Sequence, residues 1–140
     1  MIEVLVSKNS DSDADLVYEL LADFGNTSWM KGVAKTEVDG DGVGMVRNIY
    51  TTPDASPVRE KLLARDDLAR KVSYTITEGN PLPVDNYNAS VSVSEYGTGC
   101  RIEWTGSFEA KGVDDATAKT TVEGMYGVLL DWVIEGAANG

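Results

Sequence analysis

The sequence contains no histidine and only one cysteine, Cys100. Because histidine is the usual base of catalytic triads and dyads, no Ser-His-Asp or Cys-His arrangement can form within this chain. Zinc sites that use histidine, such as the HExxH motif, or several cysteines are excluded as well. A single cysteine also cannot close an intrachain disulfide. We therefore expect no metal site and no cofactor, and any acid-base chemistry would fall on carboxylates and tyrosines.

Basic residues are fewer than acidic ones: the chain has 12 lysines and arginines and 23 aspartates and glutamates, which gives a net charge of −11. A phosphate backbone and an anionic membrane surface both attract a positive protein face, so we predict no nucleic-acid partner. No apolar run in the sequence approaches the roughly 20 residues that a membrane span needs. Residues 1–6 contain no basic leader. The expected location is therefore the cytoplasm.

Two segments resemble ligand-binding loops without meeting their requirements. Residues 11–15 alternate acidic side chains as a calcium loop does, but Leu16 stands where that loop needs glycine and Ala22 where it needs glutamate. Residues 40–44 are rich in glycine, yet a strand pattern follows them, which indicates a turn and not a nucleotide-binding loop. Cys100 begins a strand pattern and is expected to be a small core residue.

The 140 residues suit one domain over residues 1–140, and 42% hydrophobic residues is an ordinary globular share. Apolar residues at helical spacing after Ser12 predict a helix that ends near Gly25. Thr27 or Ser28 is expected to begin a second short helical turn that carries Trp29. A last long helix is expected from residue 114 or 115 to about residue 136. Alternation with a period of two predicts strands over residues 2–8, 33–39, 43–51, 58–66, 70–78, 86–96 and 99–110.

The predicted strands alternate apolar and polar side chains, which is typical of a sheet with one covered and one wet face. The last helix carries an apolar stripe that consists of Ala118, Val122, Met125, Leu129, Trp132 and Val133. We expect an α+β fold, in which a curved antiparallel seven-stranded sheet wraps around the long C-terminal helix. Two short helices follow the first strand. The gap between sheet and helix is the natural place for a ligand cavity.

A family resemblance is carried by segments spread along nearly the whole chain. They are residues 13–18 (DADLVY), 20–24 (LLADF), Trp29, 42–47 (GVGMVR), 59–67 (REKLLARDD), 74–76 (YTI), 81–84 (PLPV), Tyr87, Ala89, Gly99, Trp104 and Phe108. On these residues the chain resembles the START/SRPBCC superfamily, the helix-grip or Bet v 1-like fold, and within it the polyketide cyclase/dehydrase-like branch. The resemblance implies this fold but no single activity, because the fold hosts lipid carriers, hormone receptors, cyclases, hydrolases and co-chaperones.

Arg47 and Glu60 form the most specific candidate pair. If residues 51–57 are a loop, the hairpin places Arg47 opposite Glu60 on adjacent strands. Side-chain parity then directs both inward, onto a face that is otherwise apolar. An inward ion pair is expensive to bury unless it is fully satisfied or faces a cavity. The pair is either a polar anchor for a ligand or a structural pair, and the residue pattern leaves both interpretations open.

Aromatic residues with a polar edge are expected on the same face. Tyr74, Tyr87 and Trp104 point inward from three strands, and Trp29 lies near the second helical turn. Each alone fits a packed core, whereas the set fits an apolar pocket with a few directed hydrogen bonds. Gly124 and Gly127, in the last helix, either leave room for a ligand or let the helix approach the sheet. The candidate ligand-binding residues are Trp29, Arg47, Glu60, Leu62, Tyr74, Ile76, Tyr87, Trp104, Met125 and Leu129.

The leading functional hypothesis is binding of a small apolar or aromatic ligand, polyketide- or lipid-like, between the sheet and the last helix. The alternative is a cyclase/dehydratase-type lyase, as the family resemblance implies. Its acid-base work would fall on Glu60, Tyr74 or Tyr87, with Arg47 stabilising negative charge. A second alternative is a co-chaperone-like interaction module that uses its outer surface. A homodimer is a further partner that the sequence allows.

Overall fold

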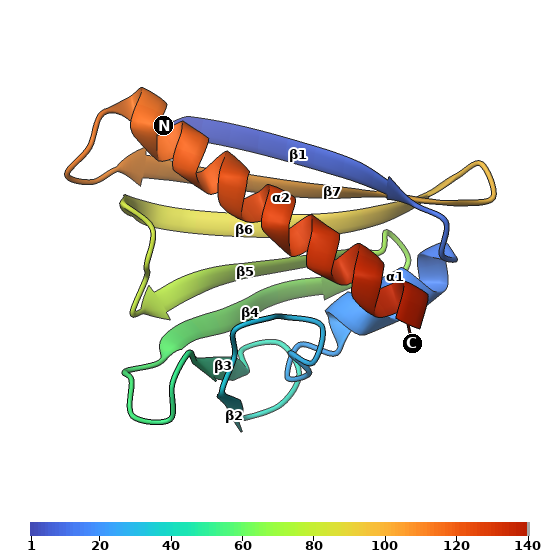
Figure 1. Ribbon diagram of the computed structural model, residues 1–140, viewed down its shortest axis with the longest axis horizontal. Coiled ribbons are helices and arrows are strands. Elements are labelled where there is room, and N and C mark those ends of the chain that lie inside the picture. The colour runs from blue at the N-terminus through green and yellow to red at the C-terminus, as the bar shows by residue number, and fades with distance from the viewer. Residues whose placement is uncertain (140) are drawn as a thin grey trace.

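The computed structural model describes residues 1–139 and contains one seven-stranded antiparallel sheet crossed by a long helix (Figure 1). The strand order is β1-β7-β6-β5-β4-β3-β2. The elements are β1 (Ile2–Ser10), α1 (Ala14–Ala22), β2 (Lys35–Asp39), β3 (Val46–Tyr50), β4 (Val58–Asp66), β5 (Lys71–Glu78), β6 (Val84–Tyr96), β7 (Gly99–Ala110) and α2 (Asp115–Asn139). This is the predicted helix-grip architecture, and the predicted strand bounds agree within a few residues.

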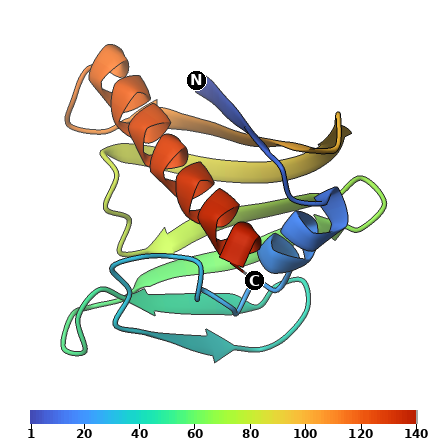
Figure 2. The same cartoon turned by 45° about the vertical axis from the view of Figure 1, so that its right-hand side comes forward.

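The sheet is built from successive hairpins, and its first strand is added at the edge beside β7. Each strand from β2 to β6 pairs with the next one along the chain, and β7 pairs with β1 on its other side. The sheet curves around α2, which lies against its inner face, while α1 lies at the C-terminal end of α2 (Figure 2). Neither helix in residues 1–139 combines the length and the apolar character that a membrane crossing requires. The inner face and α2 together enclose the core.

The buried face of α2 differs from the predicted stripe. Met125 is 36% exposed, and Leu129 and Trp132 are half-buried, whereas Tyr126 and Leu130 are fully buried. The full buried set is Ala118, Val122, Tyr126, Leu130, Val133 and Ala137. The prediction was wrong for Met125 because α2 carries apolar side chains on more than one side. Packing against the sheet, and not the sequence pattern, selects which side is buried.

The second short helix after β1 is not formed. Residues 28–32 are a turn and bends, with a single bond from the Met30 N–H to the Thr27 carbonyl. Gly32 follows with a φ of 75°, in the left-handed region, which stops helix growth. A segment this short also gains too few hydrogen bonds to offset helix nucleation. Trp29 therefore stands on an irregular turn between α1 and β2.

The glycines that permit close packing are not the two predicted in α2. A Cβ at Gly124 or Gly127 would meet nothing within 4 Å, so neither glycine is needed for the helix to approach the sheet. Gly136 instead lets α2 approach the 27–32 turn, since its Cβ would lie 2.9 Å from the Trp29 Cβ. Gly106, on β7, leaves the space that the Tyr126 hydroxyl occupies.

We predict that Gly106→Ala destabilises the protein, because the new Cβ would collide with the buried ring of Tyr126. The free energy of unfolding, measured by urea denaturation, should fall by about 1–3 kcal/mol. The matched control is Gly124→Ala in the exposed part of α2, which should raise it by about 1 kcal/mol through helix propensity. A Gly106→Ala protein as stable as the parent would refute this account of the packing.

Candidate functional site

Arg47 on β3 and Glu60 on β4 form the predicted inward ion pair. The two residues are direct partners in the strand register. Arg47 Nε donates to Glu60 Oε1 at 2.7 Å, and Arg47 Nη1 donates to the Phe24 carbonyl at 3.1 Å. The Arg47 guanidinium also lies 3.9 Å from the centre of the Phe24 ring. With only 4% and 9% exposure, the pair is buried, and its charges are balanced within the protein.

Tyr74 and Trp104 continue this row of polar groups across β5 and β7. The Trp104 indole N–H donates to the Tyr74 hydroxyl at 3.0 Å, and both side chains are almost fully buried. Burial raises the pKa of Tyr74, and the nearby negative charge of Glu60 raises it further. The Tyr74 phenol therefore stays protonated over the physiological pH range.

Tyr87 on β6 and Tyr126 on α2 complete the row. Their hydroxyls are 2.6 Å apart, in a bond for which either can be the donor. Burial is the main cause that raises the pKa of both phenols. We call these six residues the inner polar row: Arg47, Glu60, Tyr74, Trp104, Tyr87 and Tyr126. Sequence reasoning missed Tyr126, although its spacing from Val122 and Leu130 placed it on a possible buried face.

The interior beside this row is packed more tightly than the sequence predicted. A void of about 10 Å³ lies there, which is room for one water at most. Its lining consists of Leu21, Phe24, Trp29, Arg47, Val72, Tyr74, Val91 and Trp104. The Trp104 ring lies 6.3 Å from Trp29 and 6.0 Å from Tyr126, between ring centres. These aromatic rings fill the space in which a ligand cavity was expected.

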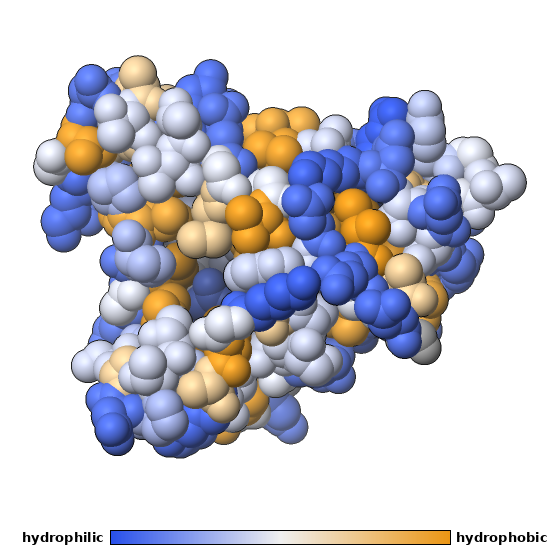
Figure 3. All heavy atoms as spheres, viewed as in Figure 1, coloured by the Kyte–Doolittle hydropathy of each residue, from blue (hydrophilic) through white to orange (hydrophobic). Residues whose placement is uncertain are grey.

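A larger space opens where β5 and β6 separate. Their pairing extends from Lys71↔Ser92 to Tyr74↔Ala89, and beyond it lies a cleft of about 410 Å³. This volume falls within the range of small-molecule sites. Its lining consists of Ile76, Thr77, Glu78, Gly79, Asn80, Leu82, Val84, Asp85, Asn86, Tyr87 and Lys111. Figure 3 shows a hollow at the left edge of the molecule, where the β5–β6 loop lies in Figure 1, and hydrophobic atoms lie within it.

The ten predicted ligand-binding residues do not form one site. Trp29, Arg47, Tyr74 and Trp104 meet at the small void, and Glu60 adjoins them through Arg47. Ile76 and Tyr87 reach the cleft. The remaining three lie apart from both spaces, namely Leu62, Met125 and Leu129.

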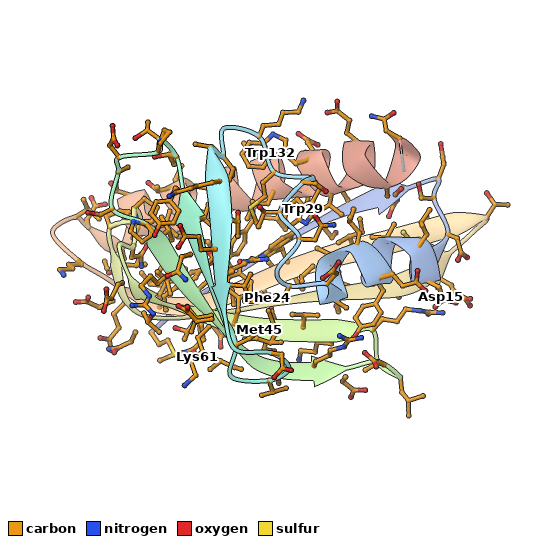
Figure 4. All side chains as sticks on the ribbon, turned by 90° about the horizontal axis from the view of Figure 1, so that it is seen from below. Asp15, Phe24, Trp29, Met45, Lys61 and Trp132 are labelled. Atoms are coloured by element: carbon orange, nitrogen blue, oxygen red, sulfur yellow. The ribbon has the colours of Figure 1, made fainter. Side chains whose placement is uncertain are left out.

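Leu62 lines a third space, of about 300 Å³, between α1 and β4. Phe24 and Met45 border the same space, and Figure 4 shows these two side chains close together. No group of three carboxylate or cysteine side chains within residues 1–139 is arranged to hold a metal ion. The candidate site is therefore the inner polar row with the cleft at its Tyr87 end.

The buried phenols predict a loss of stability at alkaline pH. The pKa of Tyr18 is raised to about 12 by burial and by its bond to the Asp67 carboxylate, and those of Tyr74, Tyr87 and Tyr126 are raised as well. A phenol whose pKa is higher in the folded state stabilises the fold below the unfolded value of about 10. That stability should disappear as the pH rises through 10 toward 12. Phenolate absorbance should then appear together with unfolding in a pH titration, and Tyr18→Phe should weaken the dependence.

Removing one charge of the Arg47–Glu60 pair should cost more stability than removing both. Arg47→Met leaves the Glu60 carboxylate buried without its partner, which should lower the free energy of unfolding by about 3–5 kcal/mol. Arg47→Met with Glu60→Leu should recover most of this loss, as measured by denaturation of the two variants and Glu60→Leu alone. A double variant as unstable as Arg47→Met would contradict the expected coupling.

Comparisons with known proteins agree with this architecture. The protein XoxI from Bacillus cereus has a TM-score of 0.84 and 24% identity, with 99% of this chain and 96% of that chain covered. A Thermobifida fusca protein has a TM-score of 0.81 and 22% identity, covering 99% and 95%. Ara h 8.0201 has a TM-score of 0.77 and 15% identity, covering 99% of each chain. At these identities the likeness shows the shared helix-grip fold.

Sequence comparisons give the family. No curated protein matches the chain. The model of the family described as polyketide cyclase / dehydrase and lipid transport matches residues 1–132, which is nearly the whole chain. The chain therefore belongs to the polyketide cyclase/dehydrase and lipid transport family.

Proposed function

We propose that this protein binds a small molecule that combines a flat apolar or aromatic body with one or more oxygen groups. The observation that carries the proposal is the inner polar row, which buries six hydrogen-bonding side chains where an apolar face would be enough to hold α2. Buried polar groups contribute little to stability compared with apolar packing of the same volume. Their presence on the inner face therefore supports a binding role.

The Tyr87 end of the row borders a space of ligand size. Tyr87 lines the 410 Å³ cleft and bonds to Tyr126 at the inner side. Ile76, Leu82 and Val84 supply apolar surface in the same cleft. A ligand there would lay its apolar body on these side chains and form a hydrogen bond with the Tyr87 hydroxyl. Tyr87 can keep its bond to Tyr126 at the same time, because a phenol hydroxyl can donate one hydrogen bond and accept another.

The raised pKa values of the tyrosines favour binding over catalysis. The phenols of Tyr74, Tyr87 and Tyr126 are held protonated by burial, so each can donate a hydrogen bond but is a poor base at neutral pH. Glu60 already accepts from Arg47. The cyclase/dehydratase alternative would need one of these groups to take up a proton, and no contact in the row favours that step.

The interaction-module alternative has little support. Met125 and Val128, on the outer side of α2, are 36% and 43% exposed, and Leu129 beside them is half-buried. Single exposed apolar side chains are common on monomeric proteins. The homodimer allowed by the sequence stays a prediction for the same reason.

The test compares 2-naphthol with 2-methylnaphthalene, which has the same ring system but no hydroxyl. We expect 2-naphthol to bind, and Tyr87→Phe to weaken its binding about fivefold, the value of one hydrogen bond of about 1 kcal/mol. Binding of 2-methylnaphthalene should not change. Isothermal titration calorimetry gives the affinities, and Tyr96→Phe, at a half-exposed tyrosine on β6, is the matched control.

Two results would count against the proposal. One is the absence of binding for both compounds. The other is an equal effect of Tyr87→Phe on both, which would mean that the substitution acts through the packing of the core and not through a bond to the ligand.

Glu60→Gln tests the other end of the row, because a folded variant with altered 2-naphthol affinity favours the ligand-anchor interpretation of the Arg47–Glu60 pair. Loss of the folded state in that variant, measured by circular dichroism, favours the structural interpretation.

A further inference from the structure

Trp29 lines two separate spaces and stands between them. One is the void of about 10 Å³ beside Arg47 and Tyr74. The other is an outer groove of about 290 Å³ between α1, the 27–32 turn and the C-terminal half of α2. The groove lining consists of Leu20, Ser28, Trp29, Lys31, Trp132, Glu135, Gly136 and Asn139. The Trp29 side chain is thus the wall between the outer surface and the Arg47 end of the inner polar row.

The groove has an apolar floor and a charged rim. Leu20, Trp29 and Trp132 supply the apolar surface, and Lys31 pairs with Glu135 at 2.9 Å at the rim. Figure 4 shows Trp29 between Trp132 on α2 and Phe24, which lines the void. Two indole rings beside an open groove suit a flat aromatic molecule.

The Trp29 indole N–H is buried without a hydrogen-bond partner within residues 1–139. Trp29 is 6% exposed, and its neighbour Trp104 shows the contrasting case, since its N–H donates to Tyr74. A buried donor without an acceptor is costly and is rare in folded proteins. The closed position of Trp29 is therefore less stable than its apolar contacts alone imply, and outward movement would let water accept from the N–H.

The turn around Trp29 is held at its Thr27 end, where Thr27 Oγ1 bonds with Thr36 Oγ1 on β2 and the Ser28 N–H donates to Asn26 Oδ1, so the movement is one of the Trp29 side chain. Trp29 stands on a turn with one backbone bond, from Met30 to Thr27, and belongs to no strand or helix. On the helix side it packs on Gly136, where a Cβ would come within 2.9 Å of the Trp29 Cβ. Moving the indole toward the groove breaks no hydrogen bond of the sheet or of α2.

We propose that Trp29 is a gate, and that its displacement opens a second binding site at the Arg47 end of the inner polar row. The site takes a flat aromatic molecule of about the size of an indole, with an oxygen acceptor on its ring. The ring takes the place of the Trp29 indole against Trp104, and the oxygen reaches the void that Arg47 and Tyr74 line. This site is distinct from the cleft at Tyr87, although both proposals rest on the inner polar row. An effect of Tyr87→Phe tests the cleft, and local opening at Trp29 tests the gate, so the two can fail separately.

The gate is tested first in the free protein, by hydrogen exchange of the indole N–H groups followed by NMR. The chain has three tryptophans, and Trp29→Phe and Trp132→Phe assign their signals. The Trp29 N–H should exchange through local opening, at a rate that low urea concentrations leave unchanged. The Trp104 N–H should exchange only through global unfolding, at a rate that rises with urea. If both N–H groups show the same urea dependence, Trp29 does not open locally and the proposal is overturned.

The site is tested with indole-3-carbaldehyde, and 3-methylindole serves as the probe without an oxygen acceptor. Indole-3-carbaldehyde should bind the parent protein and move the Trp29 N–H signal toward its solvent-exposed position. Trp29→Ala removes the gate and should strengthen binding about tenfold or more, because the closed state no longer competes. The preference for the carbaldehyde over 3-methylindole should persist in this variant, since Arg47 and Tyr74 are retained.

The matched control is Trp132→Ala, which alters the groove but not the void. It should strengthen binding far less than Trp29→Ala. Binding that Tyr87→Phe weakens and Trp29→Ala leaves unchanged would place the probe in the cleft and refute the second site. Equal affinity for the two probes in Trp29→Ala would also refute it, because the new space would then be an apolar cavity without a receptor for oxygen.

Discussion

The burial of polar side chains between α2 and the inner face of the sheet is the constraint on which the other features depend. Each such group loses its water and needs a partner inside the protein. The partners are found in pairs that join different elements, namely Arg47 with Glu60 across β3 and β4, and Tyr87 with Tyr126 across β6 and α2. The Tyr87–Tyr126 pair ties α2 to the sheet, and Gly106 on β7 leaves room for the Tyr126 hydroxyl.

This pairing also determines where free space remains. Aromatic rings fill the middle of the fold, where the void beside Arg47 is about the size of a water molecule. Larger spaces lie toward the ends of the inner polar row, at the cleft where β5 and β6 separate and at the groove beyond Trp29. The proposed binding function therefore depends on the ends of the row, where these spaces lie next to buried hydrogen-bonding groups.

Much of the architecture could be predicted from local patterns. Strand alternation and the turn residues around Gly40 and Gly97 placed the hairpins, and side-chain parity correctly placed Arg47 opposite Glu60 on the inner face. Such pairs are accessible to sequence reasoning because neighbouring strands of a hairpin share a register set by a short loop. The Tyr87–Tyr126 pair was not accessible, because it joins a strand to a helix 39 positions away with no loop to set the register.

The sequence by itself determined the order and type of most elements and which side chains of each strand point inward. Its lack of histidine also excluded catalysis by a histidine of this chain. These properties depend only on composition and on residues close together in the sequence. The tertiary structure alone decided that Tyr126 and not Met125 is buried, that Trp29 stands on a turn between two spaces, and that the expected cavity is filled. The physical reason is that α2 is apolar on several sides. Its rotation is therefore set by packing and by buried hydrogen bonds with distant strands.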